Sequence, residues 1–132
     1  MRVLIHIGLV AFGSAVGGLA RWGVGLAAAR WLGMAFPWGT LAINISGSLF
    51  LGWFTTRLGD RLLQGVGWLD ADGLRMMVAV GFTGAYTTFS TFEYETHGLF
   101  RDNHEFAALA YLAASVFLGL AAVRLGVNLA RW

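Results

Sequence analysis

The sequence contains no cysteine and no lysine, and few of its residues carry a charge. Its 132 residues include 9 basic side chains, all of them arginine, and 7 acidic ones, so only 12% of the chain is charged. Ordinary globular domains are roughly 25% charged. The lack of cysteine excludes disulfides, thiolate metal sites and cysteine nucleophiles. The small net charge of +2 argues against a nucleic-acid partner.

Apolar residues dominate what is present. They make up 58% of the chain, and the mean hydropathy is +0.67. A chain this short cannot hide so much apolar surface in one core, so lipid is the expected solvent. A membrane-crossing helix needs roughly 20 mostly apolar residues. Four segments fit, at about residues 3–28, 38–56, 74–97 and 106–127.

These segments predict an all-α integral membrane protein, with one four-helix domain over residues 1–132. The first 20 residues also resemble a signal peptide, but three further apolar segments follow, and we interpret them as a retained first helix. Four crossings place both termini on one side. Six arginines then lie on that side and three on the other, which favours cytoplasmic termini.

Small residues within the spans predict close helix packing. Gly13 and Gly17 form a GxxxG pair, and Ser48 and Gly52 form a similar pair of small residues. Such pairs let the backbones of membrane helices approach each other. A unit of four helices is small for enclosing a pathway, so we expect an oligomer, most simply a two-fold dimer.

No carboxylate lies near the middle of a predicted span, which argues against a proton-driven antiporter. The polar groups at that depth are uncharged and rich in hydrogen-bond donors: Asn44, Ser46, Ser48, the hydroxyls between residues 83 and 91, Tyr111 and Ser115. Such groups can hold helices together, at about 0.6 kcal/mol per bond, and for Asn44 alone this explanation is as good as any other. So many donors without one acid favour a lining for an anion.

The stretch GFTGAYTTFSTFEYET, residues 81–96, predicts a break in the third span. Its glycines and threonines weaken a helix, and Ser90 with Glu93 forms a capping box that marks a helix start. Broken helices place carbonyl oxygens on cations and helix N-termini near anions. The alternative is a continuous helix with hydroxyls bonded to the preceding turn. Phe89 and Phe92 share one helix face, either as ordinary packing or as ring edges that solvate a small anion.

The motifs resemble those of the Fluc (CrcB) family of fluoride channels. They are GFTGAYTTFSTFEYE at 81–95, GGLARW at 17–22, GTLAINISGSLFLG at 39–52, and the pair Tyr111 and Ser115. The motifs lie in order on all four predicted spans. One position differs, because the family often has a second glycine where this chain has Ala85.

The resemblance implies an antiparallel, dual-topology homodimer in a bacterial plasma membrane, with two pores at the interface. It implies that Phe89 and Phe92 face the pore and that hydrogen-bonding groups line it, namely Asn44, Thr91, Tyr111 and Ser115. Backbone carbonyls of Gly84 and Thr87 would hold a central Na+ that is structural and not transported. Arg21 would lie at the end of the first span, and Glu95 would be a carboxylate of the vestibule.

The function expected from this resemblance is passive, selective export of fluoride, which protects the cell from fluoride toxicity. Two alternatives are a small proton-coupled multidrug antiporter and a membrane assembly protein that transports nothing. We find no nucleophile–base pair, phosphate loop or dinucleotide fingerprint in the sequence, which argues against an enzyme.

Overall fold

The computed structural model describes residues 1–61 and 71–132. In these ranges the backbone is helical, without strands: α1 (Arg2–Leu32), α2 (Trp38–Arg61), α3 (Ala71–Leu74), the π-helix η1 (Arg75–Thr83), α4 (Gly84–Tyr86), α5 (Phe89–Arg101) and α6 (Glu105–Arg131). The predicted connection between the second and third spans includes residues 62–70, which lie outside the described residues.

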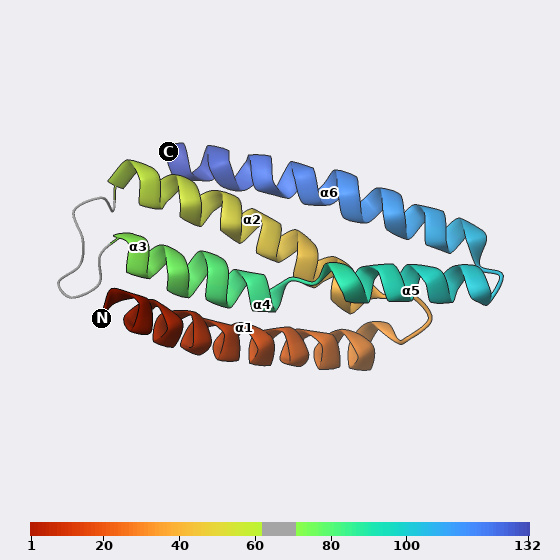
Figure 1. Ribbon diagram of the computed structural model, residues 1–132. Coiled ribbons are helices and arrows are strands. Elements are labelled where there is room, and N and C mark those ends of the chain that lie inside the picture. Colours follow the sequence, from red (N-terminus) through yellow and green to blue (C-terminus); the bar gives the residue numbers. More distant parts are fainter. Residues whose placement is uncertain (62–70) are drawn as a thin grey trace.

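The helices form an elongated bundle (Figure 1). α1 and the series from α3 to α5 run in one direction, and α2 and α6 run in the other. The N-terminus and the C-terminus therefore lie at the same end of the bundle. The α3–α5 series lies between α1 on one side and the α2–α6 pair on the other, so its midpoint faces residues from several helices.

Two helices of the described part are long and apolar enough to cross a membrane by length and composition. They are α1 and α6, whose most apolar windows have a mean hydropathy of 2.0 and 2.2. Little of either window is buried, 11% in α1 and 17% in α6. Polar residues lower the hydropathy of α2, and the third predicted span is divided into short pieces. The crossings expected at 38–56 and 74–97 therefore stay predictions.

Glycines allow the closest helix contacts within the chain. A Cβ atom at Gly13 or Gly17 of α1 would collide with the backbone carbonyl of Met77 or Phe82 in η1. In the pair formed by Ser48 and Gly52 of α2, Gly52 lies against the backbone of Val123 in α6. The close backbone approach predicted for these small residues is present at Gly13, Gly17 and Gly52.

The π-helix η1 precedes the centre of the bundle. Its wider turns let the Thr83 hydroxyl donate to the carbonyl of Val78, five residues back, at 3.0 Å. From α1, the Ser14 hydroxyl donates to the Gly81 carbonyl at 3.4 Å. Stretches of π-helix are rare and frequently occur at functional sites. Here the π-helix leads directly into α4 and the segment that follows it.

Candidate functional site

The helical path is interrupted at Thr87 and Thr88, between α4 and α5. Thr87 has φ −80° and ψ 160°, and Thr88 has φ −152° and ψ 124°, both extended. α5 then begins at Phe89, with Thr88 as its N-cap, and the Thr88 Oγ1 accepts the N–H of Thr91 at 3.3 Å. The capping box predicted at Ser90 was wrong. Ser90 already lies in the first turn, because the extended backbone that an N-cap needs is that of Thr88.

Asn44 of α2 holds this extended segment from the side. Its Oδ1 accepts the N–H of Thr88 at 2.9 Å, and its Nδ2 donates to the Thr88 carbonyl at 2.9 Å. Two neighbours of Asn44 also contact the segment. A Cβ at Gly47 would overlap the Thr87 methyl group, and the Ser46 hydroxyl lies 2.9 Å from the hydroxyl of Tyr86. One turn of α2 thus supports the whole interruption.

Several backbone carbonyls lose their usual helical donors at the interruption, and those of Gly84 and Thr87 are among them. In a continuous helix, the Gly84 carbonyl accepts the N–H of Thr88, and the Thr87 carbonyl accepts that of Thr91. Here the Thr88 N–H donates to Asn44, and the Thr91 N–H donates to the Thr88 hydroxyl. The oxygens of Gly84 and Thr87 are therefore not used to continue the helix.

A cavity of about 290 Å³ lies on one side of the interruption. Side chains from α2, η1, α5 and α6 line it together with the extended residues; those of the predicted site are Asn44, Thr87, Phe89, Phe92 and Ser115. The Ser115 hydroxyl is buried and has no hydrogen-bond partner among the described residues. A buried hydroxyl without a partner costs about 1–3 kcal/mol. Ser115 is also one of the residues that line the cavity.

A second cavity, of about 350 Å³, lies on the other side, between α1, the start of α2 with the segment that precedes it, and α5. Its polar lining includes Arg21, Thr40, Thr91 and Glu95. Arg21 lies well within α1, which continues to Leu32. The structure places Thr91 here and not with the aromatic pair, and its hydroxyl accepts a hydrogen bond from the Thr88 hydroxyl at 3.0 Å. Thr88 borders both cavities.

Tyr111 is not among the residues that line either cavity. Its side chain is fully buried, its hydroxyl donates to Glu95 at 2.7 Å, and Thr40 donates to the other carboxylate oxygen at 2.9 Å. The ring of Tyr111 contacts that of Phe92 edge to face, with centroids 5.1 Å apart. Glu95 therefore accepts two hydrogen bonds at the wall of the second cavity.

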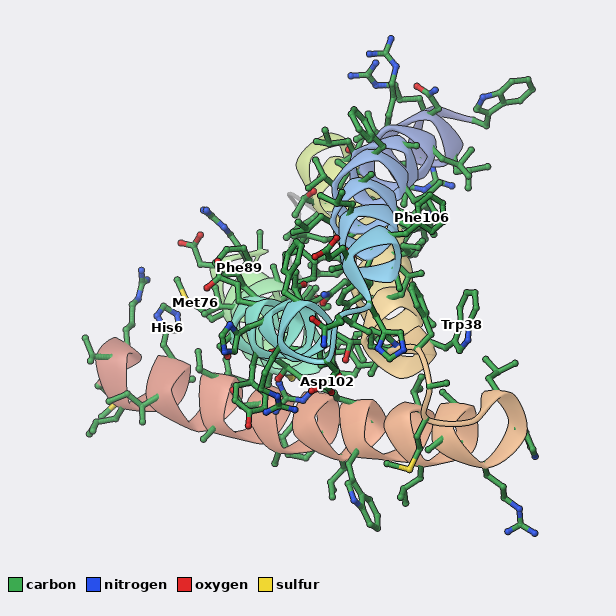
Figure 2. The ribbon with its side chains drawn as sticks, turned by 90° about the vertical axis from the view of Figure 1, so that its right-hand side faces the viewer. His6, Trp38, Met76, Phe89, Asp102 and Phe106 are labelled. Carbon is green, nitrogen blue, oxygen red and sulfur yellow. The ribbon has the colours of Figure 1, made fainter. Side chains whose placement is uncertain are left out.

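The aromatic pair of α5 is divided between the core and the surface. The rings of Phe89 and Phe92 lie 6.0 Å apart, yet Phe92 is buried and Phe89 is 70% exposed. In Figure 2, Phe89 and Trp38 lie on opposite sides of the molecule. Within one chain, therefore, one side of the first cavity is formed by an aromatic ring that nothing covers.

Two polar contacts of the site were missed by sequence reasoning. Thr40 bonds Glu95, and Thr88 bonds Asn44 and caps the N-terminus of α5. The spacing of Thr40 could have indicated its place in the site. Thr40 precedes Asn44 by four residues, so the two side chains lie on the same face of α2. No group of three or more His, Asp or Glu side chains gathers as a metal site within residues 1–61 and 71–132.

The chain is similar to known proteins over most of its length. The model of the CrcB-like protein family, Camphor Resistance (CrcB), matches residues 8–127. A protein of Chloroflexus aurantiacus named fluoride-specific ion channel FluC is 40% identical over 93% of this chain and 93% of its own length. A protein of the same name from Nitrobacter winogradskyi is 41% identical over 92% of both chains. A third, from Rhizobium johnstonii, is 40% identical over 97% of this chain and 98% of its own.

Proposed function

The chain belongs to the CrcB-like protein family, and from this we propose that it is a fluoride-specific ion channel that exports fluoride passively. The observation that carries the proposal is identity of about 40% along nearly the full length of proteins that bear this name. The proposed activity is ion conduction without covalent chemistry. The long apolar helices α1 and α6, largely exposed in the single chain, support a membrane location.

The first cavity has the chemistry that a fluoride path requires. Its polar groups are hydroxyls and an amide, and no charged side chain lines it within the described residues. Fluoride holds its water strongly, so compact donors must replace that water. The unpartnered hydroxyl of Ser115 is one such donor. A fixed positive charge at this point would bind the anion tightly and slow its release, whereas conduction needs moderate binding at several sites.

Arg21 would act before this point, from the second cavity. Its positive charge raises the local concentration of anions at an entrance without occupying the narrow part of the path. Thr91 lines that same cavity, and Thr88 borders both cavities. We infer that an anion passes from the arginine to the hydroxyls, and from there to the aromatic edges of Phe89 and Phe92.

We also propose that the Gly84 and Thr87 carbonyls hold a structural Na+. The support is the hydrogen-bond pattern, because the N–H groups that these oxygens would accept in a helix go to Asn44 and Thr88. Carbonyl oxygens suit a hard cation such as Na+. When bound, the ion adds a positive charge near the anion path.

The proposed assembly is an antiparallel homodimer, multi-pass in the plasma membrane. The exposed ring of Phe89 and the uncovered side of the first cavity support it, since a second copy would cover both. In this arrangement the third predicted span is a broken transmembrane helix, and its interruption is protected by protein on all sides, as non-helical backbone at membrane depth must be.

Efflux from liposomes tests the function. Purified protein in vesicles loaded with potassium fluoride should release fluoride to an external electrode when valinomycin sets the potential, and vesicles loaded with chloride should release none. The driving force is about 2.3 kcal/mol per elementary charge per 100 mV. Release should follow that potential without a proton gradient.

Two results would contradict the proposal. Fluoride release that requires a proton gradient would favour a coupled transporter. No release from monodisperse, correctly reconstituted protein would favour an assembly protein whose polar groups only join helices.

A further inference from the structure

We propose that Asn44 is a positioning residue, whose amide oxygen keeps the backbone at Thr88 extended and so leaves the Gly84 carbonyl available to a cation. The inference rests on the proposed Na+ site. It assigns Asn44 a role different from that of a donor to the anion, which is what the motif implied.

The contact between Asn44 and Thr88 is reciprocal. One side chain satisfies both the N–H and the C=O of a single residue, each at 2.9 Å. A pair of bonds in opposite directions fixes the orientation of the Thr88 backbone more firmly than one bond can. The bond to Oδ1 replaces the partner that the N–H of a helical Thr88 would find within its own chain.

The amide oxygen of Asn44 is the atom that keeps the Gly84 carbonyl available to the cation. A buried N–H without a partner is costly, so Thr88 must donate to something. Without Asn44, the acceptor in the helical position is the Gly84 carbonyl, four residues back. That bond would close one more turn after α4 and would occupy the oxygen proposed to face Na+. Asn44 Oδ1 accepts the N–H instead.

The Nδ2 group of Asn44 could also donate to an anion, and the experiment must separate that role from the support of the Thr88 backbone. The Nδ2 group has two hydrogens, and the Thr88 carbonyl takes one of them. Asn44 also lines the first cavity. The two roles therefore predict different effects of substitution. If Asn44 donates to the anion, its substitution changes fluoride transport at every Na+ concentration. If Asn44 supports the backbone, its substitution changes the Na+ concentration that the protein requires.

The test is a Na+ titration of the thermal unfolding midpoint, with N-methylglucamine as the replacement cation. For the wild-type protein in detergent we expect the midpoint to rise with Na+. Asn44→Leu, close in size but unable to accept the N–H, should need at least about tenfold more Na+ for the same rise. Asn44→Ala serves as a second variant should Asn44→Leu not give monodisperse protein.

Three variants complete the design. Asn44→Asp keeps an acceptor for the Thr88 N–H and should respond to Na+ at concentrations no higher than the wild type needs. Ser46→Ala removes a hydroxyl of the same turn that bonds Tyr86 and not Thr88, and should leave the titration unchanged. Ser115→Ala changes the cavity wall alone and should also leave it unchanged.

A wild-type response to Na+ in Asn44→Leu or Asn44→Ala would overturn the inference. A tenfold loss in Asn44→Asp would do so as well, because its acceptor remains. A wild-type midpoint that ignores Na+ overturns it too, even where fluoride efflux is normal and the channel proposal stands. Absent efflux with a normal Na+ titration would instead contradict the channel and leave the role of Asn44 supported.

Discussion

At the scale of single residues, the site combines satisfied and unsatisfied polar groups. Asn44, Thr88, Glu95 and Tyr111 all bond one another or the backbone. Ser115 is different, because its hydroxyl is buried at a cavity wall and has no partner within the described residues. Groups that are fully bonded shape the site, whereas a group left open can bind what passes through it.

Ser115→Ala should therefore separate stability from transport. Removing an unpartnered buried hydroxyl should leave the thermal midpoint unchanged or raise it, because no bond is lost. A hydrogen bond to a charged group contributes about 1.5–3 kcal/mol, so fluoride efflux should fall at least about tenfold. Efflux and thermal unfolding of the same preparation measure both effects.

Thr55→Val is the matched control for this change. The Thr55 hydroxyl bonds the Leu51 carbonyl of its own helix and lines neither cavity. It should leave efflux at the wild-type level. Equal loss of efflux in both variants would mean that Ser115 has no specific contact with the ion.

At the scale of elements, part of the arrangement could be predicted and part could not. The glycine pairs at Gly13 and Gly17 predicted close helix contacts, because only a missing Cβ permits them. The start of α5 was misplaced by sequence reasoning. Only Ser90 has a Glu three residues on, as a capping box needs. Thr88 is the N-cap instead, because Asn44 of another helix holds its backbone.

Gly17 and Gly18 offer a direct test of the contact between α1 and η1. Gly17→Ala should lower the free energy of unfolding by about 1–3 kcal/mol, because its methyl group would meet the Phe82 backbone. The adjacent Gly18 has nothing within 4 Å of an added Cβ, so Gly18→Ala should be neutral or stabilising by up to about 1 kcal/mol. Thermal midpoints in one detergent compare the two. A midpoint in Gly17→Ala equal to that of Gly18→Ala would contradict the contact.

At the scale of the whole molecule, one chain leaves large apolar surfaces uncovered. Phe12, Leu19, Phe117 and Leu120 are each more than half exposed. Composition predicted this surface, since an apolar chain of 132 residues cannot bury it. Composition does not decide which part would meet lipid and which part would meet the second copy of the proposed dimer. The arginine distribution favours one orientation, while the proposed antiparallel dimer needs both.

The absence of cysteine makes the orientation measurable. His104, which is exposed between α5 and α6, can be replaced by the only cysteine of the chain. If the copies insert in both orientations, a membrane-impermeant maleimide applied to intact cells should label about half of the protein, and the remainder should react only after the membrane is permeabilised. Complete labelling or none in intact cells would indicate one orientation and would exclude the antiparallel dimer.

The interruption at Thr87 and Thr88 has one electrostatic consequence. α4 ends and α5 begins there, so the negative end of one helix dipole meets the positive end of another within two residues. Both partial charges belong to peptide groups, which do not titrate between pH 4 and 10 as carboxylates and histidines do. The centre of the chain therefore presents a cation-attracting and an anion-attracting surface side by side, and neither loses its sign when the surrounding solution becomes acidic.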